Sequence, residues 1–145
     1  PRPRPAPSRA AAQDRRVSRT ALEQANLDLV LEMFAQVLNP MDSSAVERFI
    51  DVDYIQHSQL AEPGREALKR FLDTIREQTP QAVHDVKRAF VDGDHVTVHY
   101  HVRRWPGDLG WAVIDIFRVE NGKIAEHWDV LQDVVEGGPN PNSPF

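Results

Sequence analysis

The spacing of apolar residues changes at Pro80, and this change constrains the fold more than any other feature of the chain. Before Pro80, apolar residues recur every three or four positions, which is the period of a helix with one buried face. After Pro80 they alternate with polar residues, which is the period of a strand. Helices followed by a run of strands are typical of the α+β class, in which the helices pack on one antiparallel sheet.

Three helices are predicted, at residues 18–38, 43–50 and 65–78. Asn39-Pro40 ends the first, because a residue before proline is disfavoured in the helical conformation. Gly64 precedes the third helix and Pro80 stops it. The polar and aromatic segment between the second and third helices, 51–64, is predicted to be a loop.

Four strands are predicted, at residues 82–91, 95–105, 111–119 and 123–132. "DGD" at 92–94 and "NG" at 121–122 are strong signals for tight hairpin turns, so we expect an antiparallel meander. Such a sheet would curl over the helices, and the space between them is the natural place for a pocket.

The composition indicates one globular domain and excludes several kinds of function. The 145 residues are enough for a single core, and we place the domain at 18–135. A formal net charge of −5, without a basic patch that includes aromatic residues, argues against nucleic acid. The absence of cysteine excludes disulfides, thiolate catalysis and cysteine-based zinc sites.

The two ends of the chain differ from the domain between them. Residues 1–17 are rich in Pro and Arg, which predicts a disordered or irregular arm, with a dimer-clasping arm as the alternative. Residues 136–145 are rich in Gly, Pro and Asn and are predicted to be irregular. No apolar run is long enough for a membrane span or a signal core, so we expect no membrane contact and a cytoplasmic rather than an exported protein.

Asp115 lies in the middle of an apolar strand, "WAVIDIFRV" at 111–119. With a two-residue turn at Asn121-Gly122, Asp115 would lie opposite Trp128 and share a face with Trp111 and Phe117. We assign this aromatic face to the pocket. His127 and Asp129 would then lie on the other face, which is also apolar and which we expect to form a homodimer through the sheet. They could form a hydrogen-bonded pair that serves this interface, with a role in catalysis as the alternative.

A carboxylic acid in an apolar pocket should have a raised pKa, because desolvation disfavours its charged form. Asp115 is therefore a candidate general acid or base. The alternative is a structural Asp that is hydrogen-bonded to a Trp, Tyr or Arg. Tyr54, Gln56 and His57 lie in the predicted loop, where they could relay protons or orient a substrate, or only order the loop.

His84, His99 and His101 could share one face of the 82–105 hairpin. Three such histidines could hold a metal ion. Arg88 and Arg103 would lie on the same face, however, so we predict no metal site and favour a polar, partly solvated surface or a dimer interface.

Two segments, "DYIQHSQLAEPGREALKRFL" at 53–72 and "GWAVIDIFRVENGKIAEHWDVLQ" at 110–132, resemble the SnoaL-like branch of the nuclear transport factor 2-like superfamily. The resemblance implies a cone-shaped α+β barrel with a deep apolar pocket, which is often a homodimer packed sheet to sheet. It covers roughly residues 18–135, and its relatives include polyketide cyclases that close rings by aldol chemistry without metal or organic cofactor.

The resemblance also implies roles for particular residues. Asp115 matches the strand acid/base of the cyclases, and Tyr54 and His57 look like pocket residues of the same branch, with His99 or His101 as a pocket histidine. We therefore expect a cofactor-independent aldol cyclase or isomerase that acts on a small hydrophobic carbonyl compound. The alternatives are a noncatalytic ligand-binding module and a dimerisation module of the same fold.

Overall fold

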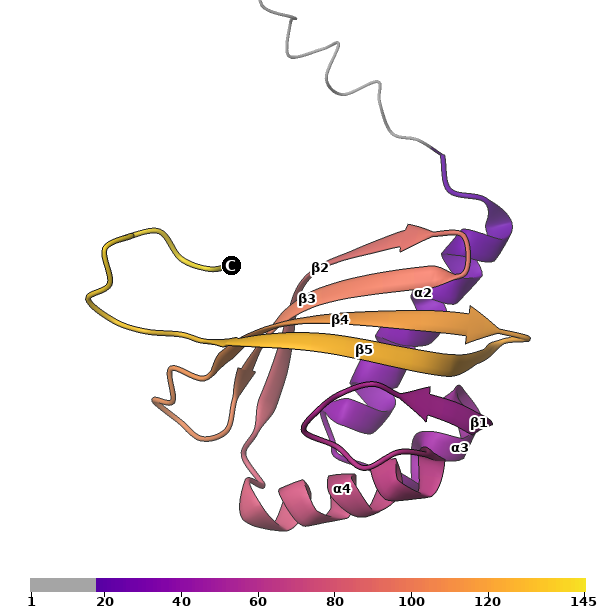
Figure 1. Cartoon of the computed structure of the whole chain (residues 1–145), viewed down its shortest axis with the longest axis horizontal. Coiled ribbons are helices and arrows are strands. Elements are labelled where there is room, and N and C mark those ends of the chain that lie inside the picture. The colour runs from indigo at the N-terminus through magenta and orange to yellow at the C-terminus, as the bar shows by residue number, and fades with distance from the viewer. Residues whose placement is uncertain (1–17) are drawn as a thin grey trace, which may run out of the picture.

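The computed structural model describes residues 18–145, so the predicted arm at 1–17 lies outside the described residues. Three helices pack on a five-stranded sheet (Figure 1), which confirms the predicted α+β class. The helices are α2 (Ala21–Met33), α3 (Val46–Phe49) and α4 (Arg65–Gln78). The strands are β1 (Ile50–Gln56), β2 (Val83–Asp92), β3 (His95–Arg103), β4 (Trp111–Glu120) and β5 (Lys123–Asp133).

The sheet has the order β1-β5-β4-β3-β2. The last four strands form the predicted antiparallel meander, but β1 pairs parallel with β5 and makes the sheet mixed. The prediction of a loop over 51–64 was therefore wrong for its first six residues. The reason is tertiary: Ile55 and Gln56 pair with Glu126 and His127 of β5, a partner that lies about half the chain away in the sequence.

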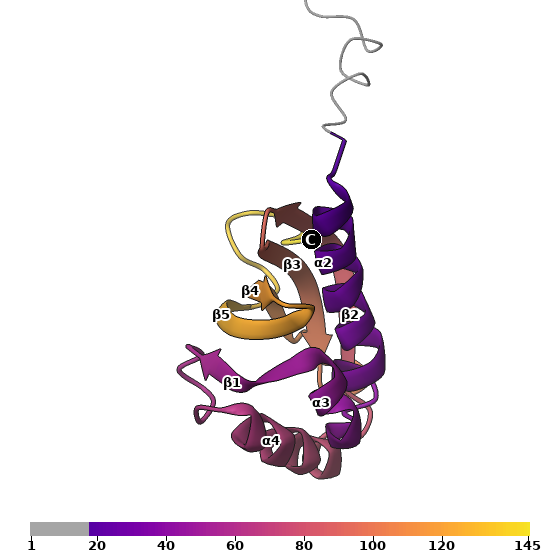
Figure 2. The same cartoon turned by 90° about the vertical axis from the view of Figure 1, so that its right-hand side faces the viewer.

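Helix α2 covers the inner face of the sheet (Figures 1 and 2). It begins with a capping box, in which Thr20 accepts from the Glu23 backbone N–H and the Glu23 side chain accepts from that of Thr20. It continues into a π-helical turn, Phe34–Leu38. This turn places the Phe34 ring edge-on against Tyr100 of β3, with 4.9 Å between ring centroids. Val30 and Val37 are fully buried at this contact between helix and sheet.

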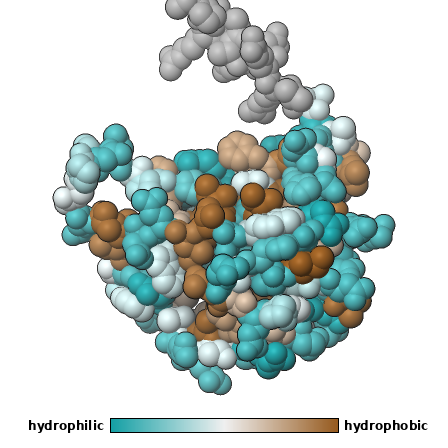
Figure 3. Space-filling view, in the orientation of Figure 1, coloured by the Kyte–Doolittle hydropathy of each residue, from teal (hydrophilic) through white to brown (hydrophobic). Residues whose placement is uncertain are grey.

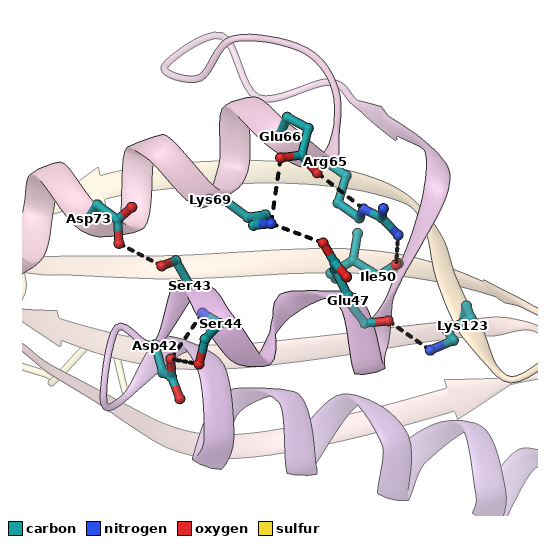
Figure 4. Close-up of polar contacts among 10 residues, drawn as sticks. All are labelled: Asp42, Ser43, Ser44, Glu47, Ile50, Arg65, Glu66, Lys69, Asp73 and Lys123. Carbon is teal, nitrogen blue, oxygen red and sulfur yellow. Dashed lines mark hydrogen bonds and ion pairs between the residues drawn. The ribbon is translucent and has the colours of Figure 1, made fainter.

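Helix α4 crosses the end of the curled sheet, and polar contacts join it to α3 and to the 3-10 helix Ser43–Ala45 that precedes α3 (Figure 4). Lys69 Nζ lies 3.0 Å from Glu47 Oε1, and the Ser43 hydroxyl donates to Asp73 at 2.6 Å. Solvent reaches these groups, so their polar contacts add little to stability. Burial of Leu72, which is fully enclosed, accounts for more of the docking of α4.

The hydrophobic core fills the space between α2 and the inner face of the sheet. Inward side chains of the sheet include Val96, Val98, Val113 and Val119, which alternate with outward ones along each strand. Among the described residues, no helix has the length and apolar character needed to cross a membrane.

Candidate active site

A cavity of about 390 Å³ lies between α4, β1 and the inner face of the sheet. This volume falls in the usual range for small-molecule sites. Most of its wall is aliphatic or aromatic, with contributions from Leu60, Leu68, Phe71, Leu72, Ile75, Val102, Trp111, Val113, Phe117 and Leu131. Five of the polar lining residues gather where β1, β4 and β5 meet: Tyr54, Gln56, Asp115, His127 and Asp129. Others, such as His84 and Arg104, lie elsewhere on the wall.

Asp115 is the centre of this polar group and is only 3% exposed. The Tyr100 hydroxyl donates to its Oδ2 at 3.0 Å. Its Oδ1 lies 3.2 Å from His127 Nε2, within ion-pair distance. Neither Oδ1 nor Nε2 makes a hydrogen bond with good geometry to any described residue, although both atoms are buried. The two atoms therefore face each other across a gap that one proton could bridge.

Gln56 determines which nitrogen of His127 carries hydrogen. Gln56 Oε1 lies 2.7 Å from His127 Nδ1 and also accepts from the Ser58 backbone N–H at 3.0 Å. Because an amide oxygen only accepts, Nδ1 must donate. Nε2 is then the nitrogen that faces Asp115. The Gln56 amide nitrogen donates to the Tyr54 hydroxyl at 3.0 Å, so one side chain connects His127 to Tyr54.

The pKa of Asp115 is raised, chiefly because burial removes water from the carboxylate. His127 and Tyr100 act against this rise, and the charge of Asp129 adds to it. Asp129 lies directly opposite Asp115 on β5. Burial and the Asp115 charge likewise raise the pKa values of Tyr54 and Tyr100, so both phenols stay protonated and can donate hydrogen bonds.

A β-bulge in β5 sets the composition of this cluster. Val119 pairs with Ile124, but Arg118 pairs with Glu126, so Ala125 is an extra residue. Beyond the bulge the register is shifted by one, and Asp115 lies opposite Asp129 and not Trp128. The predicted faces of β5 were therefore wrong from this point on, because a one-residue shift moves every side chain to the other face.

Trp128 consequently lies on the outer face of the sheet. His57 lies there too, because it follows β1, where Tyr54 and Gln56 point inward and their neighbours outward. The His57 ring stacks on Trp128 with 4.8 Å between centroids, and its Nε2 lies 2.8 Å from Glu126 Oε1. The structure therefore does not bring His57 and Trp128 together with Asp115.

A second bulge, at Lys87 in β2, separates the three histidines of the first hairpin. Val86 pairs with Tyr100, but Arg88 pairs with His99. His84 therefore shares the inner face with Tyr100 and lines the cavity. His99 and His101 lie on the outer face, where their rings stack on Phe145. The predicted convergence of the three histidines was wrong, and neither His99 nor His101 lines the cavity.

Tyr54, Gln56, Trp111 and Phe117, which were predicted to contact a substrate, all line the cavity with Asp115. Their roles remain predictions. His127 and Asp129, which the sequence pattern placed on the other face, and Tyr100, which no sequence pattern indicated, lie beside Asp115. The sequence carries no clear signal for the bulge, because consecutive apolar residues occur in this strand both at the bulge, Ile124-Ala125, and away from it, Val130-Leu131.

The same cluster is the place where the described residues could hold a metal ion. One ligand atom each from Asp115, His127 and Asp129 lies within 4.8 Å of the others. Two carboxylates and an imidazole suit a divalent cation. They equally suit a shared proton, because Asp115 and His127 already lie at ion-pair distance.

The fold and the position of the cavity define the class of protein: a cone-shaped α+β domain with a cavity inside the curled sheet. Polar side chains of the strands lie in the wall of this cavity. The model of the SnoaL-like domain matches residues 20–127, so the chain belongs to the SnoaL-like family. No curated protein matches the chain.

Several solved structures are similar to this chain in fold. A nuclear transport factor 2-like protein of unknown function from Mesorhizobium loti has a TM-score of 0.66 at 18% identity, covering 79% of this chain and 97% of that one. A candidate polyketide cyclase from Bacillus cereus ATCC 10987 has a TM-score of 0.65 at 21% identity, covering 74% of each chain. TsrD from Streptomyces laurentii has a TM-score of 0.64 at 20% identity, covering 76% of this chain and 90% of that one.

Proposed function

We propose that this protein is a cofactor-independent acid/base enzyme of the aldol cyclase or isomerase type, acting on a small hydrophobic carbonyl compound. One observation carries the proposal: a buried carboxyl group with a raised pKa, Asp115, lies at the wall of an apolar cavity and faces an imidazole. A carboxyl poised in this way can move protons next to a carbonyl group. Membership of the SnoaL-like family is consistent with this chemistry.

In the proposed reaction Asp115 removes a proton from the carbon beside the carbonyl group. The C–H electron pair moves into the carbonyl, an enolate forms, and the proton goes to the carboxylate. In the proposal His127 carries a proton on Nε2 as well as on Nδ1, and it shares the Nε2 proton with ionised Asp115 across the 3.2 Å gap, which stabilises the carboxylate. Tyr100 holds the other carboxylate oxygen in place by its hydrogen bond.

Tyr54 is the proposed donor to the substrate oxygen. Its hydroxyl lines the cavity and accepts from Gln56, which leaves its own proton free for a ligand. A hydrogen bond that strengthens as negative charge develops on the oxygen lowers the barrier to enolate formation. A proton returned from Asp115 to another atom of the same substrate would give isomerisation. Attack of the enolate on a second carbonyl of that substrate would give ring closure.

The proposal can be tested before the natural substrate is known. β-Tetralone is a hydrophobic ketone with exchangeable protons beside its carbonyl group, and NMR in D₂O measures their replacement by deuterium. We expect the wild-type protein to accelerate exchange above the buffer rate, and Asp115→Asn to lower the protein-dependent rate by about a hundredfold or more, the usual contribution of a general base.

Asp92→Asn is the matched control, because Asp92 is exposed at the end of β2 and should leave the rate unchanged. Equal exchange by wild type and Asp115→Asn would show that Asp115 is not the base. Binding of the ketone without any exchange would instead favour the noncatalytic ligand-binding function.

A further inference from the structure

The cavity and a neighbouring groove share two lining residues, Ala82 and His84. The groove has a volume of about 630 Å³. It lies between the start of β2 and the end of α2 with its π-helical turn, Phe34–Leu38. The groove is lined by Leu31, Phe34, Ala35, Asn39, Ala82, Val83, His84, Asp85 and Val86. Ala82 carries only a methyl group, so the imidazole of His84 is the larger side chain that the two linings share.

The backbone of His84 is firmly held. It pairs with Val102 in the sheet, and its N–H donates to Asn39 Oδ1 at 3.0 Å. The Lys87 bulge turns its side chain toward the cavity. The imidazole lies beside the Tyr100 ring, with 6.0 Å between centroids.

The ring itself is held by packing. Its Nδ1 is buried and has no hydrogen-bond partner among the described residues. Burial lowers the pKa of His84 to about 4, so the ring is neutral at neutral pH. The neutral ring therefore lies at the boundary between the cavity and the groove. Replacing it breaks no hydrogen bond at Nδ1.

Tyr100 connects His84 to Asp115, the proposed catalytic group. Its hydroxyl bonds to Asp115, and its ring contacts His84. A ligand that places its carbonyl group at Asp115 and extends along the Tyr100 ring would therefore meet His84. Beyond His84 the groove offers further apolar surface, from Leu31 and Ala35.

We propose that His84 is the end wall of the ligand cavity and sets the length of the apolar chain or ring system that the site accepts. This inference rests on the proposed function, because it takes the ligand to be a hydrophobic carbonyl compound. Without the imidazole the cavity would continue into the groove, and compounds longer than the wild-type limit would fit.

Methyl n-alkyl ketones of increasing chain length test this inference by calorimetric titration at neutral pH. In the wild type we expect affinity to rise by about fourfold per methylene, the effect of burying one CH₂ group, and then to stop rising at a limiting length. In His84→Ala the rise should continue past that length, so that the first ketone beyond the wild-type limit binds about fourfold tighter than it does to the wild type.

His84→Phe is the matched control, because it keeps a flat ring at the same place and should keep the wild-type limit. His84→Val gives a second opened variant with a side chain suited to a strand, in case His84→Ala does not fold. The same limiting length in wild type and in the folded opened variant would overturn the role of His84 and leave the proposed function standing. Failure of every ketone to bind the wild type would overturn the proposed ligand class, and the inference with it.

Discussion

At the scale of single residues, the main finding is that the surroundings of Asp115 differ from those that its own strand predicts. The apolar run around it indicated burial, and the residue is buried. Its partners are Tyr100, His127 and Asp129, which come from the two adjacent strands. Burial and the charge of Asp129 raise the pKa of Asp115, whereas His127 and Tyr100 stabilise its ionised form.

Tyr100→Phe tests the contribution of the phenol. Its hydrogen bond stabilises the ionised carboxylate, so its removal should raise the pKa of Asp115 further. Because a general base must be ionised to act, the acid limb of the β-tetralone exchange profile should move to higher pH. NMR exchange rates measured across pH give the position of this limb.

Tyr54→Phe serves as the comparison for this experiment. Tyr54 makes no hydrogen bond to Asp115, and we expect the variant to lower the exchange rate without moving the acid limb. An unmoved limb in Tyr100→Phe would show that the phenol does not tune the acid.

At the scale of elements, two β-bulges and one edge strand account for the differences between prediction and structure. Residue periodicity located the helices and the four meander strands to within a few residues, because periodicity follows directly from which face of an element is buried. It did not locate the extra residues Lys87 and Ala125, because a bulge depends on how two strands pair. It did not find β1, whose hydrogen bonds are made with β5.

The start of β4 provides a prediction at this scale. Gly110 has φ near +70°, and a Cβ at this position would lie 1.8 Å from the Val102 carbonyl oxygen. Gly110→Ala should therefore displace β4 from β3 and destabilise the domain by about 3 kcal/mol or more, since backbone strain adds to a steric clash. Urea unfolding followed by circular dichroism measures the loss.

Gly122→Ala is the matched control for Gly110→Ala. Gly122 also has a positive φ, near +71°, but an added Cβ would meet no atom within 4 Å. We expect it to cost about 1 kcal/mol. Equal losses in the two variants would mean that the close approach to Val102 is not what requires glycine at position 110.

At the scale of the whole molecule, the outer face of the sheet is the surface most suited to a second copy of the chain. Hydrophobic residues gather over its middle strands (Figure 3), and Ile114, Ile116 and Val130 are 40%, 37% and 66% exposed there. Adjacent apolar side chains that stay this exposed are uncommon in monomers. The sheet-to-sheet homodimer therefore remains our proposal for the assembly, with Trp128 now on that face.

Sedimentation velocity tests the dimer. We expect wild-type protein at micromolar concentration to sediment as a dimer and Ile116→Asp to sediment as a monomer, because a buried unpaired carboxylate opposes association. Leu22→Asp changes a residue that is 64% exposed on α2 and should leave the dimer intact. A monomeric wild type at this concentration would refute the interface.

The sequence by itself determined where the helices and the four meander strands lie, where the hairpins turn, and that Asp115 is buried. Each of these properties follows from local conformational preference and from the hydrophobic pattern of one segment. Only the tertiary structure decided which side chains face Asp115, that His57 and Trp128 lie outside the cavity, and that His84 lines it. These properties depend on strand register, and a single extra residue in one strand changes the face of every residue beyond it.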